Sequence, residues 1–176
     1  MLLNDRSIRK KAGDWMLEIG VLSDSHAYAL NDLPKKAVDL LGRMDLIVHA
    51  GDYTGTRLLE ELRALGEFKG VHGNMDPPEI KEVLSRREIF ELRGFKIGVT
   101  HPWDGGAPLR LESRVRRQFE QVDVIVYGHS HWTKNEVSNG ILYFNPGSVT
   151  GRFPARHKTL GVLTIEKDVV GKIITL

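Results

Sequence analysis

The chain has 176 residues, enough for a single domain with a sizeable hydrophobic core, and it contains no cysteine. The absence of cysteine excludes a disulfide framework, a thiolate zinc site and a cysteine nucleophile, and it fits the cytoplasmic location that we expect. The net charge of +2 is too small to indicate nucleic acid as a partner, and no apolar stretch approaches the roughly 18 residues that cross a membrane.

The first fifteen residues differ from the rest of the chain. They carry four basic residues and only a brief apolar start, without the apolar core of roughly 7–15 residues that a secretory signal needs. We expect residues 1–15 to be a poorly ordered N-terminal extension and residues 16–176 to be a single domain. Met16 directly precedes the first predicted strand and is a candidate natural start.

In the first half of the chain, strand-like and helix-like segments alternate. Apolar runs predict strands over Glu18–Ser23, Leu46–Val48 and Phe68–Val71. Apolar residues at helical spacing predict helices between them, from Leu33 to Met44 and from Leu58 to Leu65. This β-α-β-α-β order predicts parallel strands that are joined by right-handed crossovers.

The second half is richer in strands. One amphipathic helix is predicted from Leu111 to Val122, directly before a buried strand over Val124–Tyr127. Turn signals such as Asn139-Gly140 predict that the other strands form hairpin pairs. These pairs are Glu88–Leu92 with Phe95–Thr100, Lys134–Val137 with Ile141–Phe144, and Leu160–Ile165 with Val169–Thr175. A mixed two-sheet sandwich with helices outside satisfies these pieces best.

Metal-ligand residues stand at or just after the ends of five predicted strands. The five segments are Asp24-Ser25-His26, Gly51-Asp52, Gly73-Asn74-Met75-Asp76, Thr100-His101 and Gly128-His129-Ser130-His131. Ligands at the carboxyl ends of neighbouring strands converge on one crevice, and the three glycines let the chain turn sharply there. Hard oxygen ligands mixed with imidazoles suit first-row divalent metals. So many ligands predict one site that holds two ions rather than one.

Taken singly, each of these motifs has an ordinary structural interpretation. A Gly-Asp pair is usually a turn, and an Asp-x-His segment can be two surface residues. We interpret His49 as a packed histidine rather than a ligand and His157 as a surface residue, whereas His72 stays ambiguous. The ordered set of motifs is far more specific than any of its parts.

The ordered set resembles the calcineurin-like metallophosphoesterase family, whose pattern runs D-x-H, G-D, G-N-x-D/E, a single H and G-H-x-H. The resemblance covers the chain from Met16 to about the C-terminus. Asn145-Pro146-Gly147-Ser148 is also similar to a segment of the small bacterial and archaeal phosphodiesterase branch, which includes proteins similar to the retromer scaffold subunit. The resemblance implies an α/β fold, a four-layer αββα sandwich with two mixed β-sheets face to face and helices outside.

The resemblance also implies a role for each ligand. Asp24, His26 and His131 would bind a first divalent metal, Asn74, His101 and His129 a second, and Asp52 would bridge both. Manganese is the expected metal, with nickel, iron, zinc and cobalt as alternatives. The implied reaction is hydrolysis of small phosphodiesters by a water molecule that the two metals activate, with Asp52, Asn74 and His101 as the catalytic set.

Two positions depart from the pattern of many phosphatases of this fold. Met75 stands where they have a histidine that donates to the leaving-group oxygen, and Pro102-Trp103 follows His101 where they have Gly-His. The metal set survives both changes, but we do not expect protein-phosphatase activity. Arg152 is the candidate substrate contact, with an exposed loop arginine as the alternative, and Trp103 is a candidate contact for an aryl or base ring.

A second hypothesis is a metal-binding, protein-interaction scaffold with little or no turnover, similar to the retromer subunit. That class tends to lose the histidine of the first Asp-x-His motif, whereas His26 is present here. A nuclease or cyclic-nucleotide hydrolase of the same fold would predict a longer basic groove or a second domain, and neither is evident. We expect a small phosphodiester as the substrate and neither membrane nor nucleic acid as a partner, while a homo-oligomer stays open.

Overall fold

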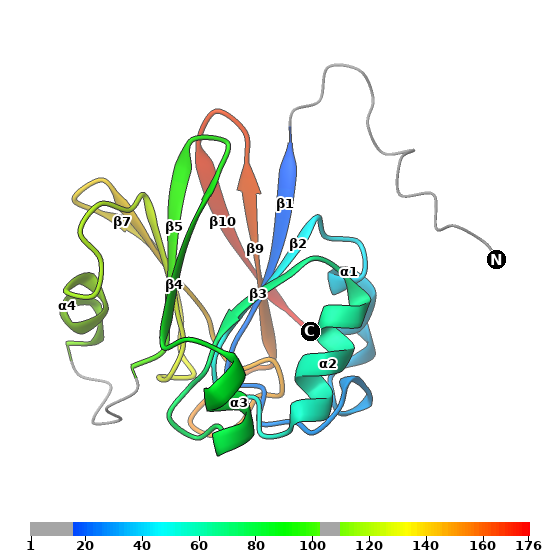
Figure 1. Cartoon of the computed structure of the whole chain (residues 1–176). Coiled ribbons are helices and arrows are strands. Elements are labelled where there is room, and N and C mark those ends of the chain that lie inside the picture. Colours follow the sequence, from blue (N-terminus) through cyan, green and yellow to red (C-terminus); the bar gives the residue numbers. More distant parts are fainter. Residues whose placement is uncertain (1–15, 103–109) are drawn as a thin grey trace.

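The computed structural model describes residues 16–102 and 110–176. The predicted extension over residues 1–15 and the candidate ring contact Trp103 lie outside the described residues. Two five-stranded sheets stack face to face, and α1, α2 and α4 lie on the outer sides of this pair (Figure 1). Among the helices of the described ranges, none is both long enough and apolar enough to cross a membrane.

The first sheet joins the N-terminal βαβαβ unit to the C-terminal hairpin. Its strand order is β10-β9-β1-β2-β3, in which β1, β2 and β3 run parallel, as predicted, while β9 is antiparallel to both β1 and β10. A short 3-10 turn, η2 (Leu30–Asp32), precedes the first crossover helix. The other elements are β1 (Leu17–Leu22), α1 (Lys35–Leu41), β2 (Leu46–Ala50), α2 (Thr56–Leu65), β3 (Phe68–Val71), β9 (Thr159–Ile165) and β10 (Val169–Thr175).

The second sheet has the strand order β4-β5-β6-β8-β7. Its three central strands β5, β6 and β8 run parallel, and the antiparallel edge strands β4 and β7 close it on both sides. The elements of this half are α3 (Pro78–Val83), β4 (Arg87–Leu92), β5 (Phe95–Thr100), α4 (Leu111–Arg116), β6 (Val124–Tyr127), β7 (Thr133–Ser138) and β8 (Ile141–Pro146). The predicted αββα sandwich is therefore confirmed.

Alternate side chains of the strands enter different cores. Ile19 and Val21 of β1 pack between the sheets with Val99 of β5 and Val126 of β6. Ile47 of β2 belongs instead to a second cluster, which includes the apolar faces of α1 and α2. Because both faces of the central strands are covered, β2 and β6 are buried throughout and have the continuous apolar sequences of sandwiched strands.

The first predicted helix, Leu33 to Met44, is longer than the helix that forms. Regular α-helix covers only Lys35–Leu41, because Pro34 stands at its N-cap and the chain turns after Gly42 at its C-cap. Proline disfavours the α conformation in the residue before it, so Leu33 is extended, with ψ of 151°. The apolar spacing correctly predicts the buried face, but it extends beyond the ends of the helix.

The helix predicted from Leu111 to Val122 ends at Arg116. Phe119 and Val122 are nonetheless buried with Val115 in the cluster beneath α4, as their apolar character predicts. The Arg116 guanidinium donates to the backbone carbonyls of Phe119 and Glu120, which stabilises a turn in place of a further helical turn. The short helix α3 was not predicted, since Ile80 is its only buried residue.

Candidate metal centre

The predicted ligands follow parallel strands of both sheets. Loops after β1, β2 and β3 carry Asp24, His26, Asp52 and Asn74, and the ends of β5 and β6 lead into His101 and the His129–His131 loop. Backbone hydrogen bonds join neighbouring loops, from the Asp24 N–H to Gly51 O and from the His26 N–H to Asp52 O, each 3.0 Å. The two sheets thus contribute to one site at the same edge of the sandwich.

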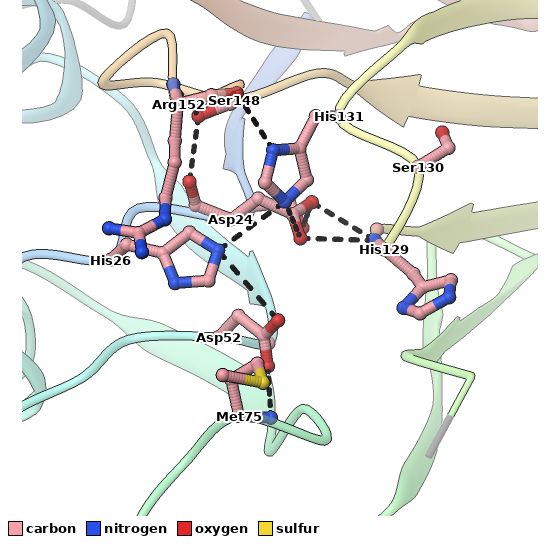
Figure 2. A network of polar contacts seen from close by, with 12 residues as sticks. Asp24, His26, Asp52, Met75, His129, Ser130, His131, Ser148 and Arg152 are labelled. Carbon is pink, nitrogen blue, oxygen red and sulfur yellow. Dashed lines mark hydrogen bonds and ion pairs between the residues drawn. The ribbon is translucent and has the colours of Figure 1, made fainter. Parts of the chain in front are cut away.

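The first predicted metal group forms a close triangle. His131 Nε2 lies 3.3 Å from Asp24 Oδ1 and 3.3 Å from His26 Nε2. The ligand atoms of Asp24, His26 and His131 all lie within 4.8 Å of one another. Figure 2 shows these three side chains pointing toward one another, with Asp52 facing the same Nε2 of His26 that faces His131.

The second predicted group lies beside the first. Asn74 Oδ1 lies 3.1 Å from His101 Nε2 and 3.1 Å from His129 Nδ1. Asp52 Oδ2 lies between the groups, 3.5 Å from His101 Nε2 and 3.9 Å from His26 Nε2. The structure therefore brings together all seven residues that the sequence predicts as ligands, with Asp52 between the two groups.

Hydrogen bonds to backbone carbonyls orient two of the imidazoles. His101 Nδ1 lies 2.7 Å from Ala50 O, and His131 Nδ1 lies 2.8 Å from Arg152 O. Because a carbonyl oxygen only accepts, each Nδ1 must carry the proton, and the neutral ring directs its Nε2 lone pair at a carboxylate. Lone pairs that face carboxylate oxygens in a buried site need a cation or a proton between them. This donor set fits a divalent metal.

The charges of the site lead to the same conclusion. Burial raises the pKa of Asp52, which is also close to the carboxylates of Asp24 and Asp76. Burial acts on Asp24 in the same direction, but the hydrogen bond from His131 and the nearby His101 and His131 rings together outweigh it and lower the pKa of Asp24. Burial alone would lower the pKa of His131, but the hydrogen bond and charge of Asp24, with the bond to the Arg152 carbonyl and the charge of Asp52, together raise this pKa. The buried carboxylates of Asp24 and Asp52 thus make this part of the site attractive to a cation.

The backbone at the ligands has an uncommon conformation. Five of the nine non-glycine residues with positive φ in the described ranges are predicted ligands. They are Asp24 (49°), His26 (43°), Asp52 (62°), His129 (84°) and His131 (60°). Each such residue costs on the order of 1–3 kcal/mol unless the surrounding structure compensates, and such strain clusters at functional sites.

Two of the three glycines next to the predicted ligands allow loops to approach one another closely. A side chain at Gly128 would overlap Ser23 Oγ and Asp24, and one at Gly73 would overlap the Asp52 carboxylate. Glycine at these positions therefore leaves the space that the ligands occupy.

Asp76 has a role that the sequence motif did not reveal. Its Oδ2 accepts the N–H groups of Asp52 (3.0 Å) and Gly73 (2.7 Å), and its Oδ1 accepts that of Tyr53 at 2.6 Å. The buried Asp76 carboxylate thus ties the loop after β2 to the loop after β3. The only signal in the sequence was its fixed place in the G-N-x-D/E pattern.

His49 is packed, as we interpreted it. Its ring stacks on Tyr53 with 3.7 Å between the centroids, and its Nδ1 accepts the Gly51 N–H at 3.1 Å. Nε2 must then carry the proton, which it donates to Ser25 Oγ at 2.9 Å, while Ser25 donates to Asp52 O. Burial lowers the pKa of His49 to about 3, so the ring stays neutral and links the first two ligand loops.

The remaining candidates lie at the margin of the site. Arg152 is exposed, its backbone N–H donates to Ser148 Oγ at 3.0 Å, and its side chain extends beside His26 in Figure 2. Met75 is 64% exposed, and its backbone N–H donates to Asp52 Oδ1 at 2.8 Å. His72 is buried and donates from Nδ1 to Gly73 O, whereas His157 is exposed, as predicted.

Comparison with known proteins decides the family. The sequence profile of the calcineurin-like phosphoesterase superfamily domain matches residues 17–168. The chain belongs to this superfamily. It is 38% identical over 162 residues to a probable metallophosphoesterase of Methanocaldococcus jannaschii, covering 90% of this chain and 81% of that protein. It is 25% identical to a phosphodiesterase of the same organism, covering 90% of this chain and 99% of that one.

Solved structures that are similar to this chain have the same fold. A structure described as a novel archaeal phosphodiesterase is 25% identical, with a TM-score of 0.72, over 91% of this chain and all (100%) of that one. Vacuolar protein sorting 29 from Cryptosporidium parvum is 24% identical, with a TM-score of 0.75, over 93% of each chain. The predicted resemblance to the family is therefore confirmed.

Proposed function

We propose that this superfamily member is a metal-dependent phosphodiesterase that hydrolyses small phosphodiesters. The observation that carries the proposal is the convergence of both predicted ligand groups on Asp52, whose Oδ2 lies within 4 Å of His101 and His26. The names of the relatives, a probable metallophosphoesterase and a phosphodiesterase, support it. We further propose two divalent ions in these groups, with manganese ahead of nickel, iron, zinc and cobalt.

In the proposed reaction the metal ions and the side chains would have different roles. When bound, the two ions would acidify a water molecule and offset negative charge on the phosphate. Asp52, Asn74 and His101 hold the centre of the site, and the carbonyls of Ala50 and Arg152 fix the tautomers of His101 and His131. The exposed Arg152 side chain is proposed to bind a phosphate oxygen, since guanidinium matches phosphate geometry.

The test is hydrolysis of phosphomonoesters and phosphodiesters after removal of metal and its restoration one metal at a time. We expect hydrolysis of bis(p-nitrophenyl) phosphate that depends on metal and exceeds hydrolysis of p-nitrophenyl phosphate. A protein that binds metal but hydrolyses no ester would favour the scaffold hypothesis instead.

Asp52→Asn tests the central position of the site. Loss of one charge next to both ligand groups should lower metal-dependent kcat/KM by roughly 100-fold or more, since even residues behind the ligands cost about 10–100-fold. Asp39→Asn is the matched control, because Asp39 is a half-exposed carboxylate that pairs with Lys35 on α1. Equal rates for Asp52→Asn and the wild type would contradict the two-metal proposal.

A further inference from the structure

A cavity of about 600 Å³ opens beside the proposed metal centre, and the function proposed above gives it no role. His131 and Trp132 line it from the loop after β6, Pro154 and Arg156 from the loop after β8, and Thr159 and Ile173 from β9 and β10. It lies where edge strand β10 of the first sheet and edge strand β7 of the second come together, joined by the bond from Asn135 Nδ2 to Gly171 O (2.7 Å). Its volume is typical of a small-molecule site.

The cavity and the proposed metal centre share one residue. His131 lines the cavity, and its Nε2 also lies 3.3 Å from Asp24 Oδ1 in the first ligand group. A phosphodiester carries two ester groups on one phosphorus. When the phosphate lies at the metal centre, one of these groups can therefore extend past His131 into the cavity.

One wall of the cavity is aromatic. Trp132 is 53% exposed, although it directly follows a predicted ligand. Its indole N–H donates to Pro154 O at 3.4 Å, which fixes the indole ring beside Pro154. A half-exposed tryptophan that is held in place at a cavity is suited to stack on a planar ring.

A segment beside the cavity is positively charged. The segment from Gly151 to Lys158 contains Arg152, Arg156 and Lys158 but no acidic residue. Of these, Arg156 lines the cavity, and the ion pairs of the described residues give it no carboxylate partner. An exposed guanidinium of this kind can bind a phosphate or carboxylate with two parallel hydrogen bonds.

We propose that this cavity binds the ester group that stays on the phosphorus, and that it favours a planar aromatic group carrying a second anion. Nucleotide esters have this chemistry: a base stacks on Trp132 and a further phosphate pairs with Arg156. The inference rests on the proposed phosphodiesterase function and narrows its substrate class.

The experiment keeps the leaving group constant and varies the retained group. The three substrates are methyl p-nitrophenyl phosphate, thymidine 5′-(p-nitrophenyl phosphate) and the same thymidine ester with a 3′-phosphate. We expect kcat/KM to rise roughly tenfold when thymidine replaces methyl and about tenfold again with the 3′-phosphate, the size of one good contact in each step. Trp132→Ala should abolish the first gain, Trp132→Phe should restore part of it, and Arg156→Gln should abolish only the second.

Lys158→Gln is the matched control for Arg156→Gln, because it removes one positive charge from the same segment at a residue that does not line the cavity. It should retain both gains. If Trp132→Ala leaves the ratio of thymidine to methyl ester unchanged, or if Lys158→Gln lowers the second gain as much as Arg156→Gln does, the proposal is wrong.

A second measurement separates this inference from the proposed function. In zinc-loaded protein, thymidine 3′,5′-bisphosphate should shift the indole N–H resonance of Trp132 in NMR spectra, whereas methyl phosphate should not. Failure to hydrolyse any ester while this shift occurs would refute the enzyme proposal and leave the cavity assignment standing. Hydrolysis without the shift would overturn the cavity assignment alone.

Discussion

Met75 places a side chain without a proton donor next to the proposed bridging carboxylate. Its backbone N–H binds Asp52 Oδ1, and its side chain is largely exposed at the site. A poor leaving group needs a proton as its bond breaks, and general acids contribute typically about 10²–10⁴-fold. The wild-type rate should therefore fall steeply as the leaving-group pKa rises in a series of aryl methyl phosphates.

Met75→His should flatten that dependence and help the poorest leaving groups most. Met75→Gln is the control, since it introduces a polar side chain of similar length without a group that titrates near neutral pH. Both substitutions retain the backbone bond to Asp52. A flat dependence in the wild type would mean that another group protonates the leaving oxygen. Asp76 is an unsuitable candidate for that group, because both of its oxygens accept backbone N–H groups.

The lowered pKa of His49 should make the stability of the metal-free protein depend on pH. Its folded-state pKa is about 3, against an ordinary value of 6.5. Between these values the unfolded chain binds a proton that the folded chain does not, so the free energy of unfolding falls as pH falls below 6.5. The loss due to His49 should reach about 2 kcal/mol near pH 5.

The measurement is urea unfolding with a chelator present, at neutral pH and near pH 5. His49→Gln retains a donor for Ser25 but does not titrate, so its pH dependence should be weaker than that of the wild type by about that 2 kcal/mol. The subtraction also removes the contributions of the other histidines. Parallel pH profiles for the two proteins would contradict the neutral, buried state of His49.

At the scale of elements, Asp76 holds two strand ends in place. Its carboxylate accepts N–H groups from the loop after β2 and from Gly73 after β3. In Asp76→Asn, an amide NH₂ replaces one of the two oxygens. In either orientation this donor group faces backbone N–H groups, which are also donors. We expect a loss of roughly 1–3 kcal/mol in the free energy of unfolding and of about 10–100-fold in metal affinity.

Titration calorimetry with manganese and urea unfolding of the metal-free protein measure these two effects. Asp45→Asn is a matched control, because Asp45 accepts a single backbone N–H, that of Glu18, at 2.9 Å, at an exposed position away from the site. It should leave metal affinity unchanged. Equal metal affinity in Asp76→Asn and the wild type would show that Asp76 stabilises the loops without positioning Asp52.

The strands and the convergence of the candidate ligands were predictable because their signals are local. Each predicted ligand lies at or just after the end of an apolar run that forms a parallel strand. The ends of these strands meet at one edge of the sandwich. The helix ends were less predictable, because Arg116 stabilises its turn through its own side chain. The role of Asp76 and the left-handed backbone of Asp24 also depend on contacts between distant segments, which no single motif encodes.

At the scale of the whole molecule, each proposed metal group draws ligands from both sheets. Asp24 and His26 follow β1 of the first sheet, whereas His131 follows β6 of the second. Asn74 follows β3, whereas His101 follows β5. A bound ion in either group would therefore link the two sheets at the edge where their loops meet, and metal binding should be coupled to global stability.

Thermal unfolding measures this coupling. A ligand at 100 times its Kd stabilises the folded state by about 2.7 kcal/mol, which corresponds to a rise in Tm of roughly 5–10 °C for a chain of this size. Manganese added to chelator-treated protein should produce that rise in the wild type and in Asp45→Asn, and a much smaller one in Asp52→Asn. The sheets would also have to unfold together, so the transition should stay single at every metal concentration. A Tm that does not move while calorimetry records binding would mean that the metal binds equally to the unfolded chain, and so not at a centre built from both sheets.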